Sequence, residues 1–424
     1  MRLFAHARVA FVALSFAAPA VAGDLNPPGP PAPTMKTLDE VEPRIPVGPL
    51  TTPGDADSVY KITQSGSYYL TGNVAGADRL SGVEIAASGV TLDLSGYELI
   101  GIVVGGRSQS GVRVTQAGAI NVVIRNGSAR GWGDDGVDAS LADSCIVEQF
   151  VASQNGRSGV RALDRATIRN VSAVANSAEG VRVRGSAIVT GVVASDNLVA
   201  GVVVGGNAVV RECVATGSAD GLVSEGVGSR FESCIASNNT GDGFIGADAT
   251  AFINCTARDN GVDGFAGASE VRMQGCTAYR NGDDGASVTG NALVTGSAFN
   301  DNGSNGLESV NGGTTVLDCL AERNIFSGFG LVDGDNHIER CTVIDQGGSA
   351  AGIGVNGQRN LVFGNRVIGG TVGIRADGVP STGTVVAANI VTGAATPFAV
   401  TASVDLGPVR ITAGNADAMD NLAR

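Results

Sequence analysis

Residues 254–285 read NCTARDNGVDGFAGASEVRMQGCTAYRNGDDG, and this stretch repeats itself after 21 residues. Asn-Gly-x-Asp-Gly occurs twice within it, and Cys-Thr-Ala occurs twice in the same relative place. An internal repeat of this length constrains the architecture more than any local propensity does.

The repeat extends well beyond this stretch. Glycine followed by a small or apolar residue recurs from Gly111 to Gly373 at a mean step of about 22 residues. One unit, residues 180–200, reads GVRVRGSAIVTGVVASDNLVA and contains three short alternating runs separated by Gly, Ser, Asn or Asp. Such runs are typical of short strands, and a helical period is missing. The sequence therefore predicts an all-β solenoid, a parallel β-helix of about 14 turns of 21–22 residues, with three short strands per turn and capped ends.

Stacked coils should place equivalent residues above one another in columns. One column of expected inward residues is Val160, Val181, Val202, Leu222, Phe244, Phe265, Ala286, Leu307 and Phe329. A column of expected bends with positive φ is Asn170, Gly191, Asn254, Gly275, Gly296 and Gly364. An expected ladder of stacked amides is Asn176, Asn197, Asn238, Asn260, Asn281, Asn302 and Asn324.

Six of the seven cysteines fall in one further column, with Ser297 among them. Strand alternation places this column inside, which favours a reduced ladder of small apolar side chains. Disulfides between neighbouring coils are the alternative, because strands about 4.8 Å apart lie within the Cα range of a disulfide.

The ends of the chain differ from the repeats. Residues 1–22 combine a basic start, a short apolar core and a small-residue cleavage site, which predicts a signal peptide and a secreted or periplasmic protein. Residues 23–54 form a proline-rich linker or strap, 55–100 an N-terminal cap and first coils, 101–395 the repeats, and 396–424 a C-terminal cap. No apolar run is long enough to predict a membrane span.

Acidic residues outnumber basic ones, giving a formal net charge of −13. Such a chain repels polyanions, so the composition argues against a nucleic-acid partner.

The serial GVRVRGSAIVTGVVASDN units and the segment from Ser58 to Gly101, SVYKITQSGSYYLTGNVAG…GVEIAASGVTLDLSGYELIG, resemble secreted right-handed parallel β-helix proteins of the pectate-lyase-like superfamily. The resemblance covers roughly residues 55–410 and implies a right-handed coil of bacterial origin. It leaves activity open, because this architecture serves lyases, hydrolases, epimerases, adhesins and inert scaffolds.

Hydrolases of this superfamily use paired carboxylates, and the best local candidate is RGWGDDGVDA at residues 130–139. Five candidate catalytic residues are Asp134, Asp135, Asp138, Arg161 and Arg182; two candidate ligand-binding residues are Trp132 and Arg113. Arginines suit sugar carboxylates, and aspartates suit acid–base work. The alternative is a ladder of ion pairs on a solvated sheet face, and the polygalacturonase and pectate-lyase motifs are incomplete here.

Aspartates also recur just before the glycine of each unit. Asp220, Asp242, Asp263 and Asp284 would lie in successive coils, either closing turns through the backbone or forming an edge that binds calcium, the one cofactor considered. His337, the lone histidine after the leader, would need Asp333 or Asp335 to act as a base, and a surface role is the simpler interpretation.

Two functions follow from these patterns. The first is a non-enzymatic protein that binds extracellular polysaccharide or a cell-surface glycan along a sheet face. The second is a polysaccharide lyase or glycoside hydrolase acting on acidic polysaccharide, with its centre between Trp132 and Arg182. The sequence favours the first.

Overall fold

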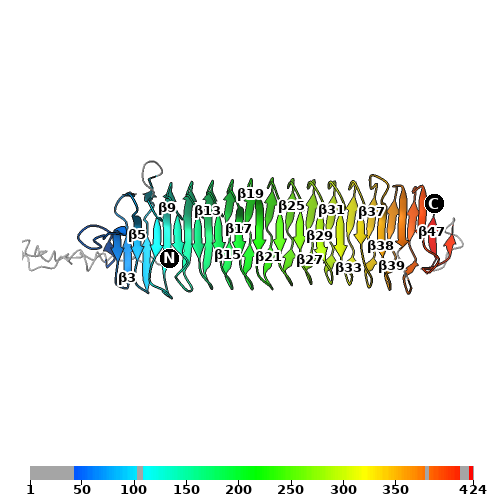
Figure 1. Ribbon diagram of the computed structural model, residues 1–424, viewed down its shortest axis with the longest axis horizontal. Helices are drawn as coiled ribbons and strands as arrows, with labels where there is room; N and C mark the ends of the chain where they lie inside the picture. The colour runs from blue at the N-terminus through cyan, green and yellow to red at the C-terminus, as the bar shows by residue number, and fades with distance from the viewer. Residues whose placement is uncertain (1–42, 103–107, 378–381, 411–419, 424) are drawn as a thin grey trace, which may run out of the picture. The chain divides into compact units, whose positions relative to one another are not determined.

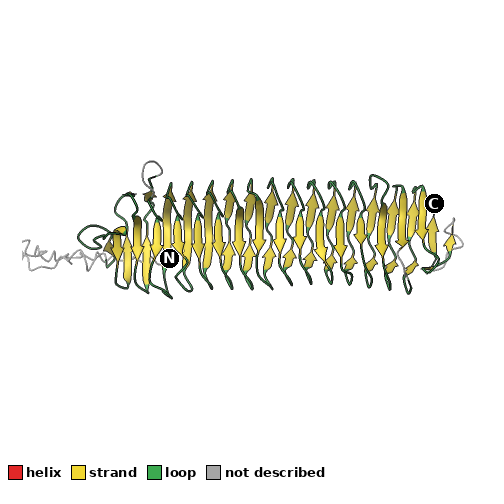
Figure 2. Cartoon of the chain, viewed as in Figure 1, coloured by secondary structure: helices red, strands yellow, loops and turns green. Residues whose placement is uncertain are grey.

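The computed structural model describes residues 43–102, 108–377, 382–410 and 420–423, and Arg44–Arg424 form one compact unit. Every regular element in the described part of this unit is a β-strand (Figure 2), which confirms the prediction of an all-β fold. Within these described ranges no helix is long and apolar enough to cross a membrane. The expected signal peptide, residues 1–22, and the expected proline-rich segment up to residue 42 lie outside the described residues.

One face of the coil is a parallel sheet of 16 strands, one from each turn (Figure 1). Its strands, in order along the stack, are β2 (Ser58–Ile62), β5 (Ser81–Ile85), β8 (Val112–Val114), β10 (Val137–Ala139), β12 (Val160–Ala162), β14 (Val181–Val183), β17 (Ala200–Val204), β20 (Asp220–Ser224), β23 (Phe244–Gly246), β26 (Phe265–Gly267), β29 (Ala286–Thr289), β32 (Leu307–Val310), β35 (Phe329–Leu331), β38 (Ala351–Asn356), β41 (Val372–Asp377) and β44 (Thr396–Val400).

The other two faces belong to one sheet of 31 strands. Its first strands are β1 (Ile45–Pro46), β3 (Gly66–Tyr69), β4 (Val74–Ala75), β6 (Val90–Asp93), β7 (Glu98–Ile100), β9 (Val123–Arg130), β11 (Ile146–Ser153) and β13 (Thr167–Val174). Its middle strands are β15 (Ile188–Thr190), β16 (Val193–Ser195), β18 (Val209–Arg211), β19 (Val214–Thr216), β21 (Arg230–Glu232), β22 (Ile235–Ser237), β24 (Ala251–Ile253), β25 (Thr256–Arg258), β27 (Arg272–Gln274), β28 (Thr277–Tyr279), β30 (Leu293–Thr295) and β31 (Ala298–Asn300). Its last strands are β33 (Thr315–Leu317), β34 (Leu320–Glu322), β36 (His337–Glu339), β37 (Thr342–Ile344), β39 (Leu361–Phe363), β40 (Arg366–Ile368), β42 (Val385–Ala387), β43 (Ile390–Thr392), β45 (Asp405–Leu406), β46 (Val409–Arg410) and β47 (Asn421–Ala423).

A typical coil therefore carries three strands, as predicted; in β9, β11 and β13 the second and third merge into one strand of eight residues. The coils number 16 rather than about 14, because the 16-stranded sheet continues through β2 and β44, where the periodic glycine is missing. Parallel pairing in register places each residue beside its equivalent in the next coil.

The predicted inward column is confirmed. All nine of its members are fully buried and neighbours pair in register, as Phe244 does with Phe265. The rings of these two phenylalanines stack with centroids 4.8 Å apart. Apolar side chains of this column pack in the interior as part of one core.

The amide ladder is also present, with one correction. Asn155, Asn176, Asn197, Ser218, Asn239, Asn260, Asn281, Asn302 and Asn324 are buried and linked by successive hydrogen bonds. The predicted member Asn238 is wrong: it is exposed with a φ of 55°, and its neighbour Asn239 occupies the ladder. Where asparagines follow one another, the amide oxygen accepts from both the backbone N–H and the side chain of the preceding coil, as Asn302 does from Asn281, so the ladder satisfies buried groups at the bend.

Left-handed residues mark the corners of each coil. The six predicted bend residues all have positive φ, from 52° at Asn254 to 67° at Gly364. Two further corners do the same and were not predicted; one of them includes Asp196, Gly217, Asp259, Arg280, Asp301 and Arg323.

All seven cysteines are buried and their thiols are free. Ser297 replaces cysteine in the predicted column, where its hydroxyl accepts from the Cys276 N–H over 3.1 Å. Burial raises the pKa of Cys145, which lies outside the column, to about 12. The seven buried thiols pack as small apolar groups, and the raised pKa makes Cys145 a poor nucleophile.

Candidate functional site

Four of the predicted site residues line up on the outer surface of the 16-stranded sheet, and Asp135 is buried beside them. Arg113, Asp138, Arg161 and Arg182 are direct register neighbours on β8, β10, β12 and β14. The same outward column continues through Val203, and Asp135 lies at the bend just before β10.

The charges of this column are satisfied within the protein. Arg161 Nη2 lies 2.9 Å from Asp135 Oδ2 and 3.4 Å from Asp138 Oδ2. Arg182 pairs with Glu179 at 2.8 Å and with Glu225 at 2.7 Å. Because both arginines are held between protein carboxylates, their guanidinium groups are poorly placed to receive a sugar carboxylate.

Arg113 is bonded to an uncharged side chain rather than to a carboxylate. Its Nη1 donates to the Gln109 side chain over 2.5 Å. Asp134 is half-buried at the bend, and no hydrogen bond or ion pair joins its carboxylate to the described residues. Asp138 accepts from the Ser140 hydroxyl over 2.6 Å.

Asp135 lies in an environment that suits a general acid, but a substrate cannot reach its carboxyl group. Burial raises its pKa to about 6, although Arg161 beside it acts in the opposite direction. Its Oδ1 accepts from the Ser158 N–H over 2.9 Å, and its side chain is fully buried beneath Arg161. A proton donor must reach the substrate oxygen, and this carboxyl reaches only protein atoms.

Trp132 is not available to a ligand, which corrects the sequence prediction. Its side chain is 1% exposed and its indole N–H donates to the Leu99 carbonyl over 3.0 Å. Its backbone N–H donates to Asn155 Oδ1, so Trp132 occupies the position that begins the amide ladder. Its ring turns into the core and presents no face on which a sugar could stack.

The aspartate column forms a second ladder. Asp220, Asp242, Asp263 and Asp284 each accept, through Oδ1, from the backbone N–H of the equivalent residue one coil later. Each carboxylate thus joins two coils through the backbone of the next coil, whereas the sequence suggested that it would close its own turn.

The same carboxylates share one crowded region. Burial raises the pKa of Asp263 to about 7, and the nearby carboxylates of Asp284 and Asp242 act in the same direction. Ligand oxygens of Asp263, Asp283 and Asp284 lie within 4.8 Å of one another, close enough to share a cation. The carboxylates of Asp263 and Asp284 already accept from backbone N–H groups one coil later, and burial raises the pKa of both.

His337 lies on β36 with its Nε2 3.0 Å from Glu339 Oε2. The aspartates considered as its partners are placed elsewhere, and Asp335 is paired with Arg359. The histidine is half-buried on a sheet face, and the carboxylate beside it is that of Glu339 rather than either expected aspartate.

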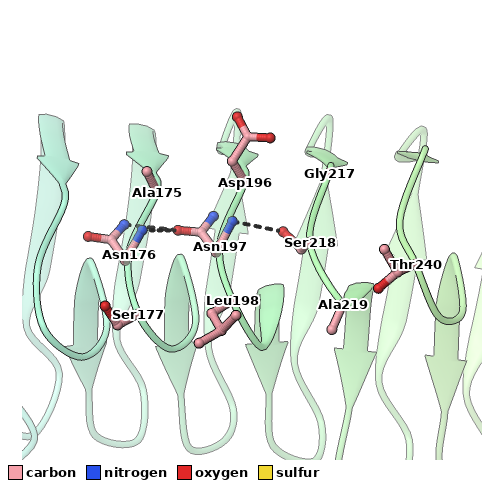
Figure 3. A pocket seen from close by; sticks show the side chains of 10 residues that line it. All are labelled: Ala175, Asn176, Ser177, Asp196, Asn197, Leu198, Gly217, Ser218, Ala219 and Thr240. Carbon is pink, nitrogen blue, oxygen red and sulfur yellow. Dashed lines mark hydrogen bonds between the residues drawn. The ribbon is translucent and has the colours of Figure 1, made fainter.

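A hollow that the sequence prediction missed lies at the amide-ladder corner. We call it the corner pocket; its volume is about 390 Å³ and its lining residues are Ala175, Asn176, Ser177, Asp196, Asn197, Leu198, Gly217, Ser218, Ala219 and Thr240. Figure 3 shows Asn176, Asn197 and Ser218 in one row across three coils, with Asp196 on one side of the row and Leu198 on the other.

The pocket arises where one coil is shortened. Three residues separate the ladder position from the next strand glycine in the coils of Asn176, Asn197 and Asn239, but only Ala219 and Asp220 separate Ser218 from Gly221. The shorter corner recedes between Leu198 and Thr240, whose coils keep the full length. A corner that is one residue short therefore opens a gap in an otherwise continuous stack.

The carboxylate of Asp196 is unpaired on the rim of this pocket. Asp259 and Asp301 stand at the same corner of later coils, and each is held by two hydrogen bonds from an arginine one coil further, Arg280 and Arg323. The residue that follows Asp196 in this column is Gly217, and no hydrogen bond or ion pair to the described residues engages the Asp196 carboxylate. Asp196 thus keeps its acceptor oxygens for solvent or a ligand.

Asn197 also keeps an unused donor. Nδ2 of Asn176 donates both to Asn197 Oδ1 at 2.9 Å and to the Ala152 carbonyl at 3.2 Å. Among the described residues, Nδ2 of Asn197 donates only to the Ala173 carbonyl at 3.0 Å, because the shorter Ser218 side chain accepts from the Asn197 backbone N–H instead. The ladder is therefore incomplete at the floor of the pocket.

Comparison with known proteins supports the architecture. Residues 200–343 and 245–391 match a family model described as the right handed beta helix region. The chain is a right-handed parallel β-helix protein. This confirms the handedness that the resemblance implied, and no curated protein matches the chain.

Several solved structures are similar to this β-helix. The A-module of Azotobacter vinelandii mannuronan C-5 epimerase AlgE6 is 17% identical, with 85% of this chain and 91% of that chain covered and a TM-score of 0.42. The Agl-KA catalytic domain is 12% identical, with 65% and 62% covered and a TM-score of 0.44. A tailspike protein of E. coli bacteriophage HK620 is 12% identical, with 86% and 71% covered and a TM-score of 0.36. Identities this low say nothing about what this chain binds.

Proposed function

We propose that this β-helix is an exported, non-catalytic protein that binds polysaccharide or a cell-surface glycan. The observation that carries the proposal is the corner pocket, where an unpaired carboxylate, the hydroxyls of exposed Ser177 and Thr240, and an exposed leucine surround one hollow. Sugars present hydroxyls and aliphatic C–H groups together, and these are the groups that such a lining contacts.

The predicted catalytic cluster supports the absence of catalysis. Its carboxyl of raised pKa, Asp135, is fully buried, and Arg161 and Arg182 are held in ion pairs. A site of this kind stabilises the sheet surface more readily than it receives a substrate.

A polysaccharide lyase or hydrolase is the second candidate, and the pKa of Asp135 favours it. A carboxyl that titrates at about 6 beside a second carboxylate, Asp138, is the pairing that glycoside hydrolysis requires. This function would need Arg161 to swing away and expose Asp135.

Incubating the full chain with a panel of neutral and acidic polysaccharides separates the two candidates. We expect retardation of the protein in affinity gels containing one of them, with no release of reducing ends and no unsaturated uronates absorbing in the ultraviolet. Release of either product, lost in Asp135→Asn, would instead establish the enzyme. A protein that binds none of the polysaccharides would contradict the proposed function.

A further inference from the structure

We infer that the corner pocket takes an uncharged sugar unit, so that the ligand is a neutral polysaccharide rather than a polyuronate. This inference rests on the proposed glycan-binding function and specifies its ligand and its place.

The charge of the lining excludes an acidic sugar. Asp196 is the only ionisable residue among the ten that form the pocket. A uronate bound there would meet a carboxylate without any cation to offset the repulsion, in a protein whose formal net charge is −13. A neutral sugar has no carboxylate, so Asp196 does not repel it.

The polar groups suit hydroxyls in particular. A carboxylate accepts hydrogen bonds and donates none, so Asp196 fits two neighbouring hydroxyl groups of a pyranose. The hydroxyls of Ser177 and Thr240, two exposed residues of the same lining, can donate to a hydroxyl or ring oxygen of the sugar. Charge-assisted bonds to Asp196 are the stronger of these contacts.

Leu198 supplies the apolar contact. Its side chain is 70% exposed, more than the other exposed aliphatic side chains of this coil, such as Ile188 at 48% and Val193 at 49%. It lies on the opposite side of the ladder row from Asp196 (Figure 3), so a ring between them meets an aliphatic surface on one side and an acceptor on the other. At about 390 Å³ the hollow falls in the lower part of the range of roughly 300–1,000 Å³ that is typical of small-molecule sites.

The short corner also fixes the number of sites. From Trp132 to Asn324 the corner at Ser218 is the one in which two residues, rather than three, precede the strand glycine. Binding along a repeated face would give several equivalent sites, whereas this corner gives one site per chain.

The decisive variant is Gly217→Arg. It recreates at this corner the arginine clamp seen between Asp259 and Arg280, and Gly217 has a φ of 68°, close to the 55° of Arg280. An added Cβ on Gly217 would approach Asp196 Oδ1 at 2.4 Å, but a carboxylate tip can turn to pair with the new arginine. Gly296→Arg is the matched control, because Gly296 also has positive φ, has open space around it and is far from the pocket.

Binding is measured by calorimetric titration of the full chain with neutral hexasaccharides of glucose, mannose and galactose, and with hexasaccharides of galacturonate and mannuronate. We expect one site per chain for a neutral probe, and no binding of either uronate. Asp196→Asn should weaken that binding about tenfold or more, the loss expected for a hydrogen bond to a charged group, and Gly217→Arg should abolish it. Asp301→Asn, in which the aspartate already has its arginine, and Gly296→Arg should bind like the unaltered protein.

Three results would overturn the inference: tighter binding of a uronate than of every neutral probe, several equivalent sites, or unchanged affinity in both Asp196→Asn and Gly217→Arg. In each of these cases the protein still binds glycan and the proposed function stands. No binding to any probe would remove the proposed function together with the inference. Circular dichroism of each variant shows that loss of binding is not loss of fold.

Discussion

The corner from Asn281 to Gly285 and the corner from Ser218 to Gly221 hold equivalent places in the stack but differ in consequence. At the first, Asn281 donates to Asn302 and to the Ala257 carbonyl and leaves no donor unused. At the second, serine replaces asparagine and one residue is missing, and the corner pocket results. Regular repetition produces a closed surface in this architecture, so a local departure from the repeat is where a binding site can form.

The largest expected effect is obtained by breaking the regular corner. Asn281→Ala removes two donated bonds and leaves the Asn260 N–H and Nδ2 without their acceptor. We expect a loss of unfolding free energy of about 3 kcal/mol or more, because several buried polar groups lose partners at once. Urea unfolding followed by circular dichroism measures it. Ser218→Ala is the control and should cost less, since its hydroxyl accepts only from the Asn197 N–H; equal losses would contradict the comparison.

The next largest effect is expected on the pH dependence of stability, through the Asp263 carboxyl in the aspartate column. Asp263 keeps a pKa of about 7, so the folded protein holds a proton that the unfolded chain releases near pH 4. The folded state then binds more protons between these values, and stability falls as pH rises from about 4 to 7. Asp263→Asn should flatten this slope and stabilise the protein at pH 8, on the order of 2 kcal/mol.

Asn305 is the precedent for this change, because it already accepts from the Ser327 N–H at the same column position. Unfolding free energies of the two proteins at several pH values test the prediction. A slope that persists unchanged in Asp263→Asn would show that other groups titrate in this range.

Repairing the irregular corner should have a smaller effect of opposite sign. Ser218→Asn supplies the missing acceptor to Asn197 Nδ2 and continues the ladder toward Asn239. We expect a gain of about 1 kcal/mol in the same urea measurement, the usual net value of a buried hydrogen bond. A loss would mean that the shortened corner has no space for the longer side chain.

The smallest effect is expected at the exposed corner ion pairs. Arg323→Ala removes the two bonds to Asp301, yet we expect no measurable change in the urea midpoint, because solvent-exposed pairs contribute little. A clear loss of stability would contradict this expectation and show that the exposed Asp301–Arg323 pair stabilises its corner. Repeating the measurement at high salt separates this ion pair from packing of the arginine stem.

Much of the fold was predictable because, in a stack of coils, residues one repeat apart in the sequence lie side by side in space. The column of Val160, Phe244 and Phe265 required only the 21-residue repeat, and the structure places its members side by side. The ladder failed at one point, where Asn238 and Asn239 are adjacent in sequence and only hydrogen bonding decides which is inside.

The site was less predictable for a physical reason. Trp132 stood out as the lone tryptophan, but its distance from Gly136 equals that of a ladder asparagine from its glycine, and this spacing indicated a buried bend. The outward charges were correctly aligned, but sequence does not reveal that Arg161 and Arg182 are already paired. The corner pocket did leave a signal: the step from Gly201 to Gly221 is one residue shorter than the step from Gly180 to Gly201.

The amide ladder has a consequence for how the chain folds. From Asn155 to Asn324 each of its bonds joins residues only 21 or 22 positions apart, so a coil is completed by the one made just before or after it. Loop closure never spans the whole chain, and growth can proceed one layer at a time from any formed nucleus. A polypeptide built in this way can begin to assemble while its later segments are still being synthesised.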